Sequence, residues 1–125
     1  MRFDIAYGRT GPLLTATGMP PSRAYLEIGD VDLHVHMSWA FSAKVPLASI
    51  TTIEALSGKK ASIGVHGWNG KWLVNGQQDQ LVRIDIDPAA AIKAKVGPVP
   101  VKLTELTVSV TEPDAFVTTL TAACS

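Results

Sequence analysis

The chain has 125 residues, of which 46% are apolar and 18% are charged, and its 11 Lys and Arg are balanced by 11 Asp and Glu. This length suggests one domain that buries about two-thirds of its unfolded surface, and the apolar fraction excludes a disordered chain. The even charge balance provides no basic face large enough to predict nucleic-acid binding.

The N-terminus and the single cysteine bear on where the protein resides. Cys124 has no second cysteine with which to form an internal disulfide, so a reducing, cytoplasmic setting is expected. Asp4 stands where a signal peptide needs an apolar run, and no stretch reaches the roughly 18 apolar residues of a membrane span.

Glycine and proline divide the chain near its start. Residues 1–22 are interrupted by Gly11-Pro12 and are predicted to be an N-terminal appendage. From Arg23 onward apolar and polar residues alternate, which predicts a β domain over residues 23–125. Its first strand is expected to run to Ile28, before a tight turn at Gly29-Asp30.

The cleanest alternation covers residues 31–39. Apolar side chains fall on one face and polar side chains on the other: Val31, Leu33, Val35, Met37 and Trp39 against Asp32, His34, His36 and Ser38. Successive side chains of a strand point to opposite faces, so this stretch predicts an antiparallel strand with one buried and one solvated face.

Later strands are predicted from alternation and β-branched residues in Phe41–Val45, Ile50–Leu56, Leu81–Ile86 and Ile92–Val96. Asn69-Gly70 and Asn75-Gly76 both match the type I′ hairpin turn. Because only Lys71 to Val74 separate the two pairs, we expect one hairpin and one looser loop. Gly97 to Pro100 is expected to be a turn or an irregular edge.

In the C-terminal part, the alternation of apolar residues shifts by one position and then gives way to helical spacing. Val101 and Leu103 share one parity and Leu106 the other, which predicts a bulge or bend near Thr104-Glu105. A helix is expected to start around Pro113, with Thr111 as its N-cap. Its apolar stripe comprises Phe116, Val117, Leu120 and Cys124.

Taken together, these elements predict a mainly β (α+β) domain of about seven strands with one C-terminal amphipathic helix. This order resembles the pleckstrin-homology-like fold, and the ending from Leu106 to Leu120 is similar to that of bacterial members. The stretch from Gly67 to Gly76, followed by Leu81-Val82 and Asp87-Pro88, resembles a group of small uncharacterised actinobacterial proteins. The resemblance implies a bent antiparallel sheet or small barrel and no particular chemistry.

Lipid-binding members of this family carry Lys and Arg around the first strand–turn–strand. Here the corresponding residues 28–32 contain Asp30 and Asp32 and no base, so this turn would repel a phosphate. Binding of phosphoinositides at a membrane is therefore not expected.

The candidate metal ligands are His34, His36 and His66. Residues two apart on a strand point the same way, so the first two imidazoles could reach one ion and His66 could be a third ligand. The alternative is that they form the solvated face of a half-buried strand, which polar Asp32 and Ser38 in the same register favour. We expect no metal or other cofactor.

The three tryptophans suggest a surface for interaction. Trp68 precedes Asn69-Gly70 and is expected near a hairpin tip, which predicts an interaction patch of Trp68, Asn69, Lys71 and Trp72. Trp39 falls on the same predicted buried face as Val35 and Met37. The alternative, which we favour for the tryptophans as a group, is aromatic packing across adjacent strands.

Motifs of hydrolases, zinc proteases and nucleotide-binding loops do not occur in the sequence. No catalytic residues are therefore assigned, and the chain is not expected to be an enzyme. Cys124 is expected to serve packing rather than nucleophilic chemistry. Lys93, Lys95 and Lys102 are expected on outward faces, where they aid solubility, protect strand edges and contact anionic lipid only weakly.

We predict a non-enzymatic binding or scaffolding module that associates with a protein partner or with itself as a homo-oligomer. A small bent sheet offers strand edges and a helix-flanked groove for strand addition. One alternative is a binder of small apolar ligands whose interior is lined by Val35, Met37, Trp39, Ile84 and Val108. A second alternative is a metal site or enzyme built on the histidines.

Overall fold

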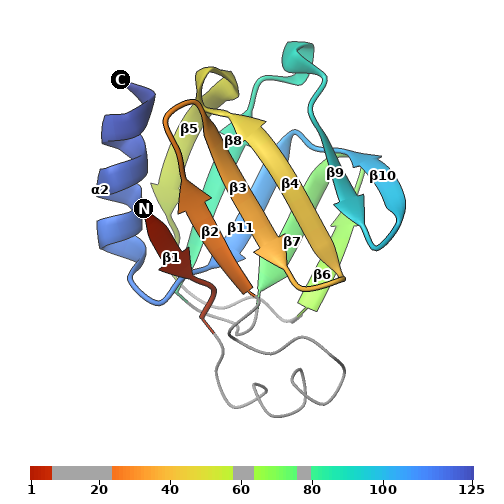
Figure 1. Cartoon of the computed structure of the whole chain (residues 1–125), viewed down its shortest axis with the longest axis horizontal. Helices are drawn as coiled ribbons and strands as arrows, with labels where there is room; N and C mark the ends of the chain where they lie inside the picture. The colour runs from red at the N-terminus through yellow and green to blue at the C-terminus, as the bar shows by residue number, and fades with distance from the viewer. Residues whose placement is uncertain (7–23, 58–63, 76–79) are drawn as a thin grey trace.

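Two β-sheets face each other in the computed structural model, which describes residues 1–6, 24–57, 64–75 and 80–125 (Figure 1). The six-stranded sheet has the order β1 (Arg2–Asp4), β2 (Ala24–Ile28), β3 (Asp32–Met37), β4 (Phe41–Pro46), β9 (Lys93–Val96) and β10 (Val99–Lys102). The five-stranded sheet has the order β5 (Ile50–Ala55), β8 (Leu81–Ile86), β11 (Glu105–Ser109), β7 (Lys71–Asn75) and β6 (Gly64–Trp68). The helix α2 (Pro113–Cys124) ends the chain.

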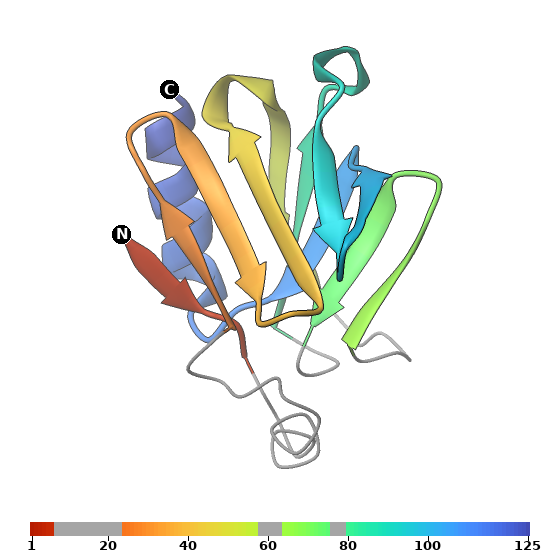
Figure 2. The same ribbon diagram turned by 45° about the vertical axis from the view of Figure 1, so that its right-hand side comes forward.

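The mainly β class with one C-terminal helix is confirmed, but the described strands outnumber the seven or so that were expected. Short strands such as β1 and β10 have too few residues to show a clear alternation in the sequence. Within the described residues the two sheets do not close into a barrel. The chain changes sheet at η2 (Leu47–Ser49), between β4 and β5, so one continuous sheet is replaced by two layers (Figure 2).

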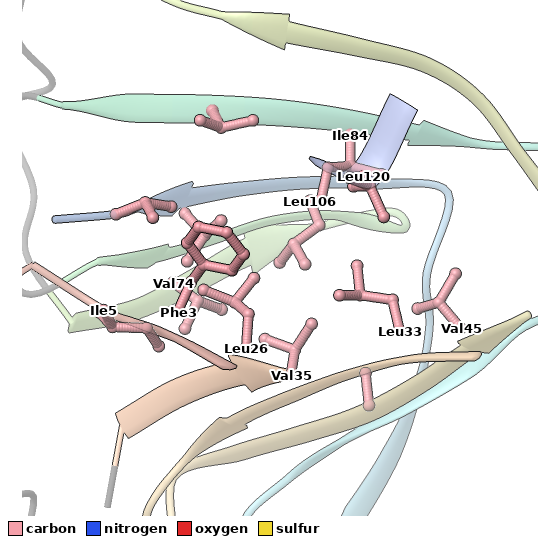
Figure 3. Packing of buried hydrophobic residues seen from close by; sticks show 14 of the residues in the cluster. Phe3, Ile5, Leu26, Leu33, Val35, Val45, Val74, Ile84, Leu106 and Leu120 are labelled. Carbon is pink, nitrogen blue, oxygen red and sulfur yellow. The ribbon is translucent and has the colours of Figure 1, made fainter. Parts of the chain in front are cut away.

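The core lies between the two layers. Leu26, Leu33 and Val35 from one sheet face Val74, Ile84 and Leu106 from the other (Figure 3). All six are at most 1% exposed, so burial of apolar surface is the principal stabilising contribution of this arrangement.

The alternation predicted for residues 31–39 is confirmed in its centre and wrong at both ends. Leu33, Val35 and Met37 are buried, whereas Val31 and Trp39 are 70% and 62% exposed. Alternation fixes a side chain's face only while the strand lasts, and β3 covers only Asp32–Met37. Trp39 follows Ser38, whose φ of 47° belongs to the turn into β4.

The change of phase near Thr104-Glu105 marks a change of sheet rather than a bulge within one strand. β10 ends at Lys102 in the six-stranded sheet, and β11 begins at Glu105 in the five-stranded sheet. Leu103, between them, is buried in the common core. Val101 in β10, Leu103 directly after it and Leu106 in β11 therefore all face the core although their parities differ, because the two strands belong to different layers.

The first residues of the chain belong to the six-stranded sheet. β1 pairs antiparallel with β2, and the side chains of Phe3 and Ile5 are buried. Ile5 forms a bridge with Val110, and the Ala6 N–H donates to the Ser109 carbonyl oxygen at 2.9 Å, which joins the β1 edge to the end of β11. The appendage was predicted over residues 1–22, and residues 7–22 of it lie outside the described residues.

Helix α2 lies beside β5 at one side of the two layers (Figures 1 and 2). Phe116 and Leu120 are fully buried, as the apolar stripe predicted. The predicted N-cap was wrong: Glu112 occupies this position without a side-chain capping bond. The Thr111 N–H instead donates to the Asp4 carbonyl oxygen at 3.1 Å, so Thr111 extends the contact with β1. No helix among the described residues is long and apolar enough to cross a membrane.

Candidate functional site

The turn between β6 and β7 has the predicted hairpin geometry. Asn69 and Gly70 have φ values of 53° and 88°, as a type I′ turn requires. The turn is held in place from outside, because the N–H groups of Thr104 and Glu105 donate to the Gly70 carbonyl oxygen at 2.7 and 3.1 Å. One of the two Asn-Gly pairs was expected to be a looser loop, and Gly76 of the second pair lies outside the described residues.

The structure splits the predicted interaction patch of Trp68, Asn69, Lys71 and Trp72. Asn69 and Lys71 are exposed, whereas Trp72 is half-buried and packs against the core. Its ring centroid lies 6.5 Å from that of Phe41 in the other sheet. Trp68 ends β6 opposite Lys71, and its side chain lies outside what the structure describes, so its exposure stays a prediction.

A glycine makes room for the indole of Trp72. Gly67 pairs with Trp72 across β6 and β7, and a Cβ atom added to Gly67 would overlap the indole ring. The ring therefore covers the backbone of the neighbouring strand. Its Nε1 atom is buried and makes no hydrogen bond with the described residues, so packing rather than polar contact holds it.

His34 and His36 lie on the outer face of the six-stranded sheet, as the period-two pattern predicted. His34 is exposed and pairs with Glu27 and Lys44 on the adjacent strands. His36 is half-buried, and its ring lies 5.4 Å from that of Tyr25.

The structure does not bring a set of metal ligands together around these histidines. His66 is on β6, in the other sheet, and its side chain lies outside the described residues. Among the described residues no three His, Cys, Asp or Glu side chains gather as a metal site would require. The proposed set of three ligands therefore receives no support from the geometry.

The five residues predicted to line an apolar ligand pocket do not all lie in the interior. Val35, Met37, Ile84 and Val108 are buried in the core shared by both sheets. Trp39, assigned to the same interior, lies in the β3–β4 turn and is exposed. Its assignment to the interior was wrong, since the alternation on which it rested ends at Met37.

An open groove runs between β5 and the last turn of α2. Its volume is about 440 Å³, and it is lined by Ile50, Thr51, Thr52, Ile53, Thr121, Cys124 and Ser125. None of the six residues of β5 is buried, and β5 is one of the two outermost strands of its sheet. The sequence predicted the strand and the helix separately, but no local pattern shows that they meet.

The strand wall of this groove is irregular. The register with β8 shifts between Ile50 and Thr52, and the hydroxyl of Thr51 donates to the Asp85 carbonyl oxygen at 3.2 Å. A bulge bends a strand and increases its twist. The opposite wall contains the only cysteine, and burial raises the pKa of the Cys124 thiol, so it remains protonated at neutral pH.

Comparison with known protein families, with curated proteins and with solved structures found no match to this chain. Its function is therefore argued from the geometry of the described residues.

Proposed function

We propose that this chain is a non-enzymatic binding module of pleckstrin-homology-like fold, in a cytoplasmic setting, that takes an extended segment of a protein partner between β5 and α2. One observation carries the proposal. β5, one of the two outermost strands of the five-stranded sheet, has no buried residue and forms one wall of an open groove of about 440 Å³. The arrangement of two sheets and one C-terminal helix supports the fold assignment.

An edge strand provides the attraction for such a segment. In a ladder, alternate residues direct their N–H and C=O groups to either side, so an outermost strand presents unpaired groups on its free side. An extended peptide can add to these groups as a further strand, and its backbone then supplies affinity without regard to sequence.

The groove lining determines which side chains suit this position. It combines the aliphatic Ile50 and Ile53 with the hydroxyl groups of threonines and Ser125, and it contains no charged side chain. A charged peptide side chain would lose hydration there without an oppositely charged side chain in the lining to compensate. The favoured partner segment therefore has small aliphatic or hydroxyl side chains at the positions that point into the groove.

β10, one of the two outermost strands of the six-stranded sheet, is less suited to strand addition. Pro100, in the middle of β10, has no N–H to donate, and the strand ends at the exposed Lys102. The proposal places both partner binding and the predicted self-association at β5, because β5 is the outermost strand that lines the groove.

Two substitutions on α2 test this proposal. Thr121 and Thr118 are both exposed, but only Thr121 lines the groove. Thr121→Arg places a long charged side chain across the groove, and Thr118→Arg is the matched control on the same helix. A random peptide library displayed on phage is selected against the wild-type protein, and the enriched peptides are then measured on all three proteins.

We expect enriched peptides to bind the wild type and Thr118→Arg alike and to lose at least tenfold in affinity for Thr121→Arg. Methylation of alternate backbone nitrogens in the peptide should also abolish binding, since it removes the donors of the added strand. Enriched peptides that bind both variants equally, or a library without any enriched sequence, would disprove the proposal. Light scattering at tens of micromolar tests self-association, which Thr121→Arg should reduce.

A further inference from the structure

A second, chemically different depression lies on the outer face of the six-stranded sheet. Its volume is about 410 Å³, and polar side chains from β2, β3, β4 and β9 surround it: Tyr25, His34, His36, Ser42, Lys44, Lys93 and Lys95. It shares no lining residue with the groove between β5 and α2. Its function is therefore independent of the one proposed above.

The strand register explains why the face is hollow at this place. Tyr25, His36, Ser42 and Lys95 form one row across four adjacent strands. Ser42 has the smallest side chain of the row and stands between two long ones, so the space above it stays open. On the far side of the row the Arg2 guanidinium carbon lies 4.4 Å from the centroid of the Tyr25 ring.

The lining consists of hydrogen-bond donors and positive charges. The three lysines provide ammonium groups, and no carboxylate lines the depression. Among the described residues, Lys93 and Lys95 have no acidic side chain within ion-pair distance, and Lys44 lies 3.6 Å from Asp32. The Lys44 side chain is 66% exposed, so this ion pair is weak and leaves the ammonium group able to bind another anion.

Positive charge is concentrated here although the chain as a whole is neutral. Four of the 11 Lys and Arg residues, Lys44, Lys93, Lys95 and Lys102, lie on the adjacent strands β4, β9 and β10. Lys93 and Lys102 stand directly opposite each other, an arrangement of like charges that destabilises a sheet. Edge protection does not account for Lys44, Lys93 and Lys95, because β4 and β9 are inner strands.

We propose that this depression binds a tetrahedral oxyanion of the phosphomonoester type, with Lys44 and Lys95 as its main cationic contacts and the Ser42 hydroxyl as a donor at its floor. Ammonium groups and hydroxyls form charge-assisted hydrogen bonds with phosphate oxygens. An anion there would also relieve the repulsion among the lysines. The phosphate belongs either to a soluble phosphoester or to a lipid headgroup. This position is distinct from the acidic β2–β3 turn, for which phosphoinositide binding was not expected.

Inorganic phosphate is the probe for the first experiment. The full chain, labelled with ¹⁵N, is titrated with phosphate at constant ionic strength, and chloride serves as the reference anion. We expect saturable shifts of the amide signals of Ser42, Lys44 and Lys95 and their neighbours on β3. Lys44→Gln and Lys95→Gln should each weaken the affinity by about three- to tenfold.

Thr118→Glu is the matched control, because it changes the net charge by the same amount on an exposed position of α2. It should leave phosphate binding unchanged. Thermal unfolding of each variant confirms that the substitutions, all at solvent-facing positions, do not unfold the chain. Shifts that do not saturate, that chloride reproduces, or that persist in both lysine variants would overturn the proposal.

Vesicles distinguish the two sources of the phosphate. Phosphatidylcholine vesicles are compared with vesicles that also contain phosphatidic acid, whose headgroup is a phosphomonoester. Phosphate binding together with sedimentation on the phosphatidic acid vesicles supports a lipid headgroup, and phosphate binding alone supports a soluble ligand. Sedimentation without any response to phosphate would overturn the proposed site, since it would indicate nonspecific attraction to a charged surface.

Discussion

The rings of Phe3 and Phe116 meet edge to face, with their centroids 5.2 Å apart and their planes at 74°. Phe3 lies on the first strand and Phe116 on the C-terminal helix, and both are buried. This contact ties the two ends of the chain to one core, so the first strand is part of the folding unit rather than an addition to it.

Phe3→Ala should therefore destabilise the fold by about 3–5 kcal/mol, the loss typical of a buried phenylalanine. Urea unfolding monitored by tryptophan fluorescence measures the free energy. Val99→Ala is the control, because Val99 is 56% exposed, and it should change the free energy by less than about 0.5 kcal/mol. Equal effects of the two substitutions would show that the first strand is dispensable.

Gly67→Ala should destabilise the chain by about 1–3 kcal/mol, because the new methyl group and the Trp72 indole cannot occupy the same space. The cause is tested by a double-mutant cycle with Trp72→Leu. The smaller side chain leaves room for the methyl group, so the double variant should lose less stability than the sum of the single changes. Strict additivity would show that the indole does not limit this position.

Gly70 and Gly97 provide a comparison of two turns. Both have positive φ values, 88° and 60°, and an alanine at either position costs about 1–2 kcal/mol in backbone strain. At Gly70 an added Cβ would also lie 2.8 Å from the Thr104 hydroxyl oxygen, whereas at Gly97 it would meet open space. Gly70→Ala should therefore lower the unfolding free energy more than Gly97→Ala does. The reverse order in thermal or urea unfolding would contradict the described contact of the β6–β7 turn.

Cys124 should react slowly with thiol reagents in the folded protein. Burial raises its pKa, and only the thiolate is nucleophilic, so the reactive fraction at neutral pH is smaller than for a free cysteine. Its alkylation by iodoacetamide, followed by mass spectrometry, should accelerate when urea unfolds the chain. A folded-state rate equal to that of free cysteine would show that the thiol is solvated.

Several local features could be predicted from residues close together in the chain. The burial of Leu33, Val35 and Met37 follows from alternation along one strand, and the turn at Asn69-Gly70 follows from the positive φ values these residues tolerate. The buried face of α2 likewise follows from the spacing of Phe116 and Leu120. Each depends on interactions within a few residues, which a sequence displays directly.

Local patterns gave wrong predictions for Trp39, for Thr111 and for the residues near Thr104. Trp39 continues the parity of β3 but lies beyond its last residue, and Thr111 has a suitable type for an N-cap but bonds to β1. The opposite parities around Thr104 reflect a passage between two sheets. In each case a contact with a distant part of the chain decided the outcome.

The sequence alone determined the β class, the terminal helix, one hairpin turn and the solvent-facing side of His34 and His36. Only the tertiary structure decided that the strands form two sheets, that β5 and α2 border a groove, and that Lys44 and Lys95 flank Ser42 on one face. The reason is physical: side-chain periodicity specifies which face of a strand is buried, whereas the choice of neighbouring strand depends on packing between residues far apart in the chain.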